Sequence, residues 1–264
     1  MADITAAMVK ALRELTGLSM MDCKNALVEA AGDIAKAQDI LRKKGLTSAE
    51  KKASRATGEG LVVIQTAPAG GSATMIEVRC ETDFCARNGE FRAMAAEVAR
   101  LASAGPDGAI EASPAMTAAV QACLAKIGEN MAFARGVKIS APRVGVYVHH
   151  NGKVGVVIGV EGEVAEPLLT ELCQHIAFHD PMGVTAEDIP ADFIEREKRL
   201  AVEQAVESGK PKDIAEKMVA GKLKKALAKN ALLEQPFVRD ETRSVREVLG
   251  AAKVTAFARF AIGG

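Results

Sequence analysis

The sequence predicts an α+β protein with a small three-helix N-terminal bundle, a core of two hairpin-plus-helix antiparallel-sheet subdomains, and a protruding antiparallel helical hairpin. Helical periodicity fills residues 1–45, and paired apolar strands begin at Leu61 and again at Val144. Two further helical segments flank "ESGKPKD". With 264 residues, the chain is long enough for several packed units. The expected divisions are a three-helix domain with its linker (1–55), a first core subdomain (56–143), a second core subdomain (144–190 with 231–264) and a helical hairpin (191–230).

Composition narrows the class of function. The 34 basic and 34 acidic residues cancel, so the chain lacks the basic excess typical of proteins that bind nucleic acid directly. Five scattered cysteines and an amphipathic N-terminus that contains acidic residues do not suggest a secreted protein. Because no apolar run approaches the roughly 18 residues of a membrane span, we expect a cytoplasmic protein without membrane contact.

The N-terminal helices are predicted from their caps and apolar faces. Thr5 caps the first helix, and Ser19 with Asp22 three residues later resembles a capping box for the second. Asp33 caps the third helix, and Gly45 is expected to close it. The following stretch, "TSAEKKASRATGEG", is predicted to be a linker or a helix that frays into one.

The core is predicted to repeat one structural order. The strands "LVVIQT" and "ATMIEVRC" are followed by a helix from Asn88 to about Ala102. The strands "VGVYVHH" and "KVGVVIGV" flank Asn151-Gly152, a signal for a two-residue hairpin turn, and a helix follows from about Pro167 to Phe178. We interpret this as a structural pseudo-repeat, although residue identity between the halves is too low to demonstrate duplication.

The C-terminal third is predicted to begin with two helices. Gly209 and Pro211 interrupt the helical pattern of residues 191–230, which favours an antiparallel helical hairpin. A short helix near 244–249 and the strand "KVTAFARFAIG" complete the expected elements.

A further stretch, "VRCETDFCARNGEF", joins a strand to a helix. Thr82 to Arg87 is predicted to be the connecting loop, and it places Phe84 beside Asp83. The pattern alone leaves two interpretations of Phe84: a core residue that folds under its own loop, or a residue that contacts a partner.

Motifs for chemistry are largely absent from the sequence. It contains no phosphate-binding loop and no dinucleotide fingerprint, and we predict no cofactor. Cys173, His175 and His179 lie on one predicted helix, where the two histidines either bind a metal in an oligomeric metalloenzyme or form part of a packing face. No Glu follows His175, so the packing face is favoured. We therefore predict no metal, and no enzyme that makes or breaks covalent bonds.

Three motifs, "TGLSMMDCKNAL", "TDFCARN" and "SGKPKDIAEKMV", closely resemble those of the translation elongation factor Ts family, in the family's order and over essentially the whole chain. The resemblance implies a guanine-nucleotide exchange factor that binds elongation factor Tu with GDP, displaces Mg²⁺ and promotes GDP release so that GTP can bind. It also implies that Thr82, Asp83, Phe84 and Cys85 dislocate the partner's Mg²⁺, with Phe84 wedged between two partner helices. The family commonly has Val where this chain has Cys85.

The resemblance implies further contacts with elongation factor Tu, through Met20, Met21, Asp22 and Lys24 in the bundle and through His150 on the second hairpin. Other interpretations stay open at this stage. Either methionine could staple the small bundle, Asp22 could act only as a capping partner, and His150 could be an exposed turn residue.

Two implications concern assembly and length. The resemblance leaves open whether the chain forms a homodimer or a complex of two copies with two partners. Longer family members continue beyond the position of "RFAIGG" with a helix that touches the partner, so this contact is not expected here.

A different class of function is a ubiquitin-associated-like adaptor without exchange activity. A three-helix unit with a Gly-Leu-Ser-Met loop resembles such domains. This reading explains residues 1–45 and leaves the Thr-Asp-Phe motif and the tandem core without a role.

Overall fold

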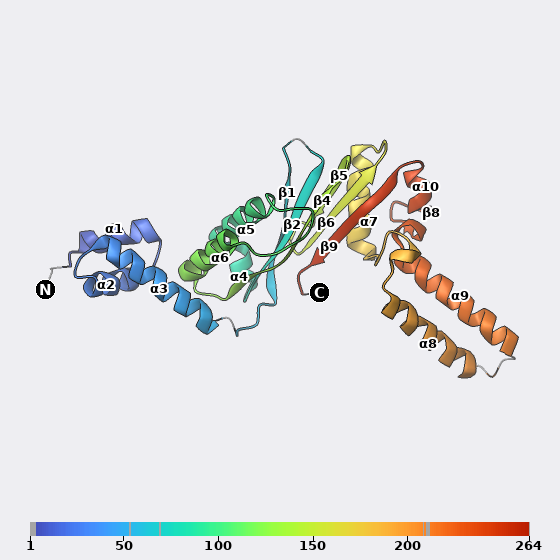
Figure 1. The fold of residues 1–264 in the computed structure, drawn as a ribbon, viewed down its shortest axis with the longest axis horizontal. Helices are drawn as coiled ribbons and strands as arrows, with labels where there is room; N and C mark the ends of the chain where they lie inside the picture. The colour runs from blue at the N-terminus through green and yellow to red at the C-terminus, as the bar shows by residue number, and fades with distance from the viewer. Residues whose placement is uncertain (1–3, 53, 69, 208, 210–211, 264) are drawn as a thin grey trace.

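The computed structural model describes residues 4–52, 54–68, 70–207, 209 and 212–263. The predicted α+β class is confirmed: three helices lie at one end, two antiparallel sheets lie in the middle between layers of helices, and a helical hairpin projects at the other end (Figure 1). Within the described residues, no helix is both long and apolar enough to cross a membrane.

The N-terminal bundle forms as its caps predict. Met8 N–H donates to Thr5 Oγ1 (3.3 Å), Asp22 N–H to Ser19 Oγ (3.1 Å) and Lys36 N–H to Asp33 Oδ1 (3.1 Å). Leucine, valine, alanine and cysteine side chains from all three helices form a common core. The helices are α1 (Ala6–Thr16), α2 (Met20–Glu29) and α3 (Ile34–Lys52).

The prediction that Gly45 closes the third helix is wrong, because α3 continues through it to Lys52. The residues that follow include Ala, Glu and Lys, which favour helix. Gly45 instead lies beside α6 (Pro114–Ile127) of the core, where an added Cβ would be 3.6 Å from the Cβ of Ala125. The helical part of the linker expectation is therefore correct, and α3 connects the bundle to the core.

The first sheet has the strand order β1-β2-β4-β3. Helices α5 and α6 cover its outer face, and side chains of β2 such as Ile76 and Val78 share one core with Phe91 of α5 and Met116 of α6. The predicted hairpin and helix are present, whereas α6, β3 and β4 were not foreseen. The bounds are β1 (Glu59–Thr66), β2 (Ser72–Cys80), β3 (Gly108–Ile110), β4 (Met131–Ser140) and α5 (Gly89–Ala102).

The second sheet has the strand order β5-β6-β9, and α7 covers its outer face. Val156, Ile158 and Val160 alternate along β6 and contact Leu169 and Leu172 of α7 in one core. The bounds are β5 (Arg143–Val148), β6 (Val154–Glu161), β9 (Lys253–Ala261) and α7 (Glu166–His179).

The two sheets pack face to face between the helical layers (Figure 1). Met75 of the first sheet shares this inner core with Val157 and Phe260 of the second. Gly155 of β6 faces β1, and a Cβ at this position would overlap Cγ1 of Val62. A residue without a side chain therefore allows the sheets to approach closely.

The β5–β6 turn also joins the sheets, because Val62 N–H donates to the carbonyl of Gly152 (2.8 Å). The hairpin is confirmed, but the two-residue turn is not: Gly152 has a positive φ of 72° and Asn151 does not, and Val148 pairs with Gly155. A type I′ turn needs positive φ at both central residues.

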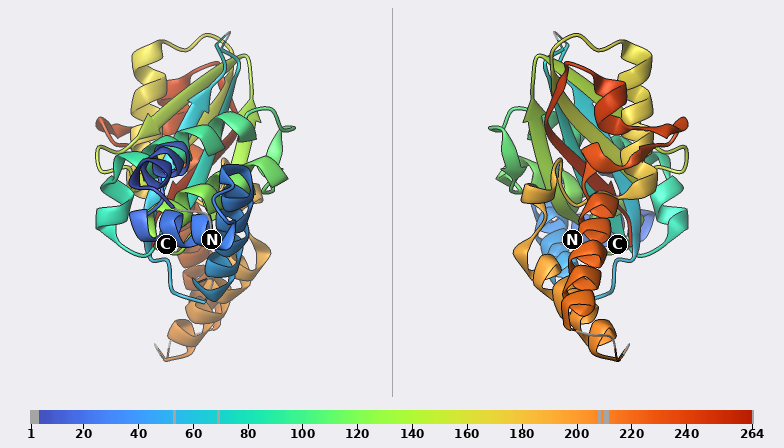
Figure 2. Two further views of the ribbon diagram at one scale, coloured as in Figure 1. Left: turned by 90° about the vertical axis from the view of Figure 1, so that its left-hand side faces the viewer. Right: turned by 90° about the vertical axis from the view of Figure 1, so that its right-hand side faces the viewer.

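The predicted helical hairpin is confirmed, and it extends beyond the sheet layers in both views of Figure 2. Short elements after it return the chain to the second sheet, and β7 pairs with β8. The bounds are η1 (Ala186–Asp188), α8 (Ala191–Glu207), α9 (Lys212–Asn230), η2 (Leu232–Glu234), β7 (Pro236–Phe237), β8 (Asp240–Ser244) and α10 (Val245–Leu249). Of the predicted hairpin breakers, Pro211 lies outside the described residues.

Candidate partner-binding site

The predicted loop between β2 and α5 is instead a short helix, α4 (Asp83–Arg87). Thr82 has extended backbone angles and caps this helix, because its Oγ1 accepts a hydrogen bond from Cys85 N–H (3.1 Å). The loop prediction was therefore wrong in form, and the segment is ordered by a local cap.

Phe84 points away from the protein on this helix. Its side chain is 79% exposed, whereas Cys85 and Ala86 are buried against the first sheet. Successive helical residues face different directions, so burial of the next two residues turns Phe84 outward. In the free chain, Phe84 is not a core residue folded under its own loop. The large apolar ring of Phe84 is therefore accessible to a partner.

Asp83 lies in the first turn of α4 beside Phe84. Its Oδ2 is 3.1 Å from a guanidinium nitrogen of Arg87, one turn later on the same helix. The Arg87 side chain is exposed and that of Asp83 is partly exposed, and surface ion pairs of this kind contribute little to stability. The Asp83 carboxylate is therefore available to a partner at little cost.

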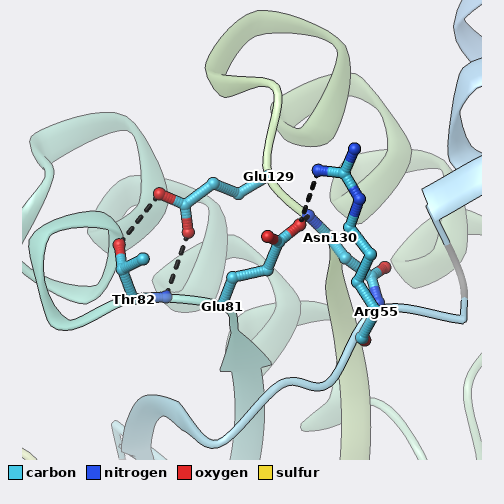
Figure 3. Close-up of polar contacts among 5 residues, drawn as sticks. All are labelled: Arg55, Glu81, Thr82, Glu129 and Asn130. Carbon is cyan, nitrogen blue, oxygen red and sulfur yellow. Dashed lines mark hydrogen bonds and ion pairs between the residues drawn. The ribbon is translucent and has the colours of Figure 1, made fainter.

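Two carboxylates fix the base of α4 (Figure 3). Thr82 donates twice to Glu129, from its backbone N–H (3.1 Å) and from Oγ1 (2.8 Å). Glu81 accepts from Asn130 N–H (2.5 Å) and from the Arg55 guanidinium (3.4 Å), and Asn130 Nδ2 donates to the Arg55 carbonyl (2.8 Å). The Asn130 N–H, and then Arg55, hold the pKa of Glu81 below its usual value.

Sequence reasoning missed Glu129 and Asn130, which follow α6 directly. Gly128, with a positive φ of 87°, caps the end of α6 and turns the chain toward β4. A polar pair after such a glycine is a recognisable turn signal, but nothing local indicates that the turn meets Thr82, which is 47 residues away.

The bundle residues of the predicted contact surface lie together on α2. Met20, Met21, Asp22 and Lys24 are exposed, and neither methionine belongs to the bundle's core. Asp22 also accepts a hydrogen bond from Ser19 Oγ (2.6 Å), so it does have the capping role considered for it.

An exposed valine extends this surface and was not predicted. Val28 follows Met21 and Lys24 at spacings of seven and four, which places the three residues on one face of α2. Helical periodicity on the outer face is the signal that could have identified it.

His150 is exposed in the β5–β6 turn, with its ring 4.2 Å from the ring of His149. His149 in turn contacts the hydroxyl of Tyr147 through Nδ1 (2.8 Å). The predicted site residues thus occupy three separate elements: α4 with its cap, α2 of the bundle, and the turn of the second sheet.

Of the two histidines considered as metal ligands, His175 lies in the protein interior and His179 is exposed. His175 is buried; Val238 N–H donates to its Nδ1 (3.2 Å), so its Nε2–H donates to Gln235 Oε1 (2.9 Å). Both ring nitrogens are therefore occupied, and burial lowers the pKa of His175 to about 4. Burial also raises the pKa of Cys173 to about 12. Among the residues that the structure describes, no group of three or more potential ligands is arranged to hold a metal ion.

The thiols near α4 do not provide a nucleophile. Cys80 donates to the Thr82 carbonyl (3.2 Å), and burial raises its pKa to about 11. Burial raises the pKa of Cys85 still further. Both thiols are thus protonated at neutral pH, and the thiolate is the reactive form. The site offers a shaped and charged surface rather than a reactive group.

Comparison with known proteins identifies what the chain is similar to. A family model described as Elongation factor TS matches residues 81–264. The chain is 44% identical over 266 residues to the elongation factor Ts of Pasteurella multocida, with 100% of this chain and 93% of that protein covered. It is 43% identical to that of Actinobacillus succinogenes (100% and 92% covered) and 42% identical to that of Alkalilimnicola ehrlichii (98% and 92% covered).

Proposed function

Because the chain belongs to the elongation factor Ts family of translation elongation factors, we propose that it is the guanine-nucleotide exchange factor of elongation factor Tu. It binds the partner with GDP, displaces Mg²⁺ and promotes GDP release so that GTP can bind. The family's role is exchange, without covalent chemistry. The exposed Phe84 on the capped helix α4 is the observation that carries this mechanism.

Phe84 supplies binding energy that depends on the state of the partner. Burying a phenylalanine side chain contributes roughly 1.5–3 kcal/mol, and nearly all of this is unrealised in the free chain, where the side chain is 79% exposed. If Phe84 is buried only in the nucleotide-free complex, it favours that state by about one to two powers of ten. Coupling between the two ligands is reciprocal, so nucleotide binding is weakened by the same factor.

Asp83 acts on the metal end of the nucleotide site. Mg²⁺ requires near-ideal octahedral geometry, so a small displacement of its ligands or waters loosens its hold on the phosphates. A carboxylate brought beside that region competes for the metal's ligands and waters. Asp83 is adjacent to Phe84 on α4, which means that wedge and carboxylate enter the partner together.

Contacts outside α4 hold the partner in place. Met20, Met21, Asp22 and Lys24 present an exposed surface on α2 that suits a protein partner, because methionine adapts to the shape of the surface it meets. His150 supplies a second contact from the β5–β6 turn. The adaptor reading accounts for residues 1–45 alone, whereas the similarity to elongation factor Ts proteins spans nearly the whole chain.

Release of a fluorescent GDP analogue from elongation factor Tu, with catalytic amounts of this protein, tests the proposal. The unaltered chain should accelerate release, and Phe84→Ala should lose about one to two powers of ten of that acceleration. Asp83→Asn keeps the shape of the side chain and removes its charge. With this variant, elongation factor Tu should also release GDP more slowly than with the unaltered chain, most clearly at high Mg²⁺ concentration.

Val206→Ala is the matched control, since Val206 is 74% exposed on α8 and lies outside the proposed contact surface. It should match the unaltered chain. If Phe84→Ala and Asp83→Asn also match the unaltered chain, the proposed exchange activity is retained but the wedge mechanism is refuted. If the unaltered chain does not accelerate release, the proposed function itself is refuted.

A further inference from the structure

We propose that Glu129 is a positioning residue for nucleotide exchange: its carboxylate holds the cap of α4 and thereby sets the direction in which Phe84 and Asp83 are presented. The inference rests on the proposed function and assigns a role to a residue on the turn between α6 and β4. Glu129 acts through Thr82 and does not itself need to touch the partner.

The length of α4 makes an external support necessary. The helix spans Asp83–Arg87, only five residues, and isolated helices of fewer than about 12 residues are marginal in water. Its outward residues, Phe84 and Arg87, do not fasten it to the core. Its inward residues, Cys85 and Ala86, are small and apolar, and apolar packing is not directional. At its far end α4 continues through Asn88 into α5, and at its near end the polar contacts of its base set its orientation.

Those contacts form a continuous chain from the helix to Glu129. Cys85 N–H donates to Thr82 Oγ1 (3.1 Å), and the same hydroxyl donates to Glu129 Oε1 (2.8 Å). The Thr82 backbone N–H donates to the other carboxylate oxygen (3.1 Å). Hydrogen bonds to a charged acceptor are shorter and stronger than neutral ones. Because both oxygens of one carboxylate hold both donors of one residue, Thr82 is fixed in position and in rotation.

The same turn also contacts the segment that follows the N-terminal bundle. Asn130 donates to Glu81 through its N–H and to the Arg55 carbonyl through Nδ2 (2.5 and 2.8 Å). Arg55 lies between α3 and β1, and Glu81 immediately precedes Thr82. The Glu129–Asn130 turn thus contacts both the cap of α4 and the connection between the bundle and the first sheet (Figure 3).

Glu129→Gln is the informative substitution, because it keeps the shape of the side chain but removes the charge and turns an amide donor toward a donor of Thr82. Glu97→Gln is the matched control: Glu97 pairs with Arg100 on its own helix, α5, and has no contact with α4 among the described hydrogen bonds. Glu129→Asp, which keeps the charge on a shorter side chain, serves if Glu129→Gln unfolds.

Two measurements distinguish positioning from a general loss of stability. The first is the maximal rate of GDP release at saturating exchange factor, with the concentration that gives half of that rate. The second is backbone hydrogen exchange of residues 82–86 in the free chain, which needs no partner. Thermal unfolding of each variant accompanies both.

Glu129→Gln should lower the maximal rate about tenfold and change the half-saturating concentration by less than about threefold, since the surface on α2 is intact. The amides of Thr82 and Cys85 should exchange faster in Glu129→Gln, while Glu97→Gln stays within about twofold of the unaltered chain. Glu129→Asp should show a smaller loss in the same direction. An unchanged maximal rate in Glu129→Gln, or unchanged amide exchange, overturns the inference. If the unaltered chain does not accelerate GDP release, the proposed function fails. Faster amide exchange in Glu129→Gln would then still show that Glu129 stabilises α4, without a role in nucleotide exchange.

Discussion

Mild acidification should destabilise the protein through His175. This side chain is fully buried, accepts a hydrogen bond from Val238 N–H at Nδ1 and donates from Nε2 to Gln235. Gln235 is itself held by the Lys229 carbonyl, to which its Nε2 donates (2.7 Å). A proton added to His175 would have to go on Nδ1, where it would oppose the N–H of Val238 in a site that is closed to solvent. The folded state therefore resists protonation.

The size and sign of the effect follow from the pKa of His175, which burial lowers from 6.5 to about 4. Between these values the unfolded chain binds a proton that the folded chain does not, so the free energy of unfolding rises with pH. The contribution is complete above about pH 6.5 and is lost as the pH falls to about 4. A difference of about 2.5 units corresponds to about 3 kcal/mol. Burial also lowers the pKa of His179, opposed by Glu241, so its effect has the same sign.

Urea unfolding measured at intervals from pH 5 to 7.5 provides the assay. This range avoids the carboxyl groups with lowered pKa values, such as Glu81, whose contribution is lost below about pH 4.5. The stability of the unaltered chain should fall by about 2 kcal/mol from pH 7 to pH 5. His175→Gln, which cannot titrate, should be less stable at pH 7 and have a flatter profile. Equal stability of the unaltered chain at pH 5 and 7, or an unchanged profile in His175→Gln, would refute the reasoning.

Other substitutions probe the core and the site. Gly155→Ala places a Cβ against β1 and should lower the free energy of unfolding by about 1–3 kcal/mol in urea titrations; a neutral result would mean that the sheets are free to separate. Cys85→Val replaces a buried thiol with an apolar group of similar size, so GDP release should stay within about twofold. Arg135→Ala leaves the buried Glu77 with Arg79 as its remaining ion-pair partner and should destabilise by up to about 3 kcal/mol, whereas an effect below about 0.5 kcal/mol would contradict the need for both cations.

Elements with local signals could be predicted from the sequence. Thr5, Ser19 and Asp33 cap their helices through hydrogen bonds that span three residues, so the information lies within one turn of chain. The alternating strands and the helical hairpin likewise depend on short-range periodicity. Gly45 was wrongly predicted to end α3 because glycine often ends helices, whereas the Ala, Glu and Lys residues after it favour continuation.

Elements that depend on distant contacts could not be predicted in the same way. Strand β4 is interior to the first sheet, yet "MAFARGVKIS" carries two cations and a glycine and does not alternate cleanly. Its pairing with β2 includes a shift in register between Glu77 and Val78, where Glu77 meets Arg135. The exposed Arg135 of this strand pairs with the buried carboxylate of Glu77 on β2, and this contact becomes apparent only when the two strands are paired in the fold.

The site shows the same division between local and distant information. The Thr-Asp-Phe motif predicts a contact through Phe84, and the outward direction of this side chain follows from the burial of Cys85 and Ala86 and from the helical backbone that Thr82 caps. The support from Glu129 spans 47 residues of sequence and has no local signature.

The difference between a loop and a supported helix has a consequence for exchange. A phenylalanine on a mobile loop would have to be ordered when it enters the partner, at a cost of about 0.5–1.5 kcal/mol for the side chain and more for the backbone. That cost would reduce the binding energy of Phe84 that is available to weaken the partner's affinity for GDP. In this chain the cap of Thr82 and its two hydrogen bonds to Glu129 order α4 before the partner arrives. Under the proposed mechanism, more of the free energy of burying Phe84 is then available to favour the nucleotide-free state, and by reciprocity to expel the nucleotide.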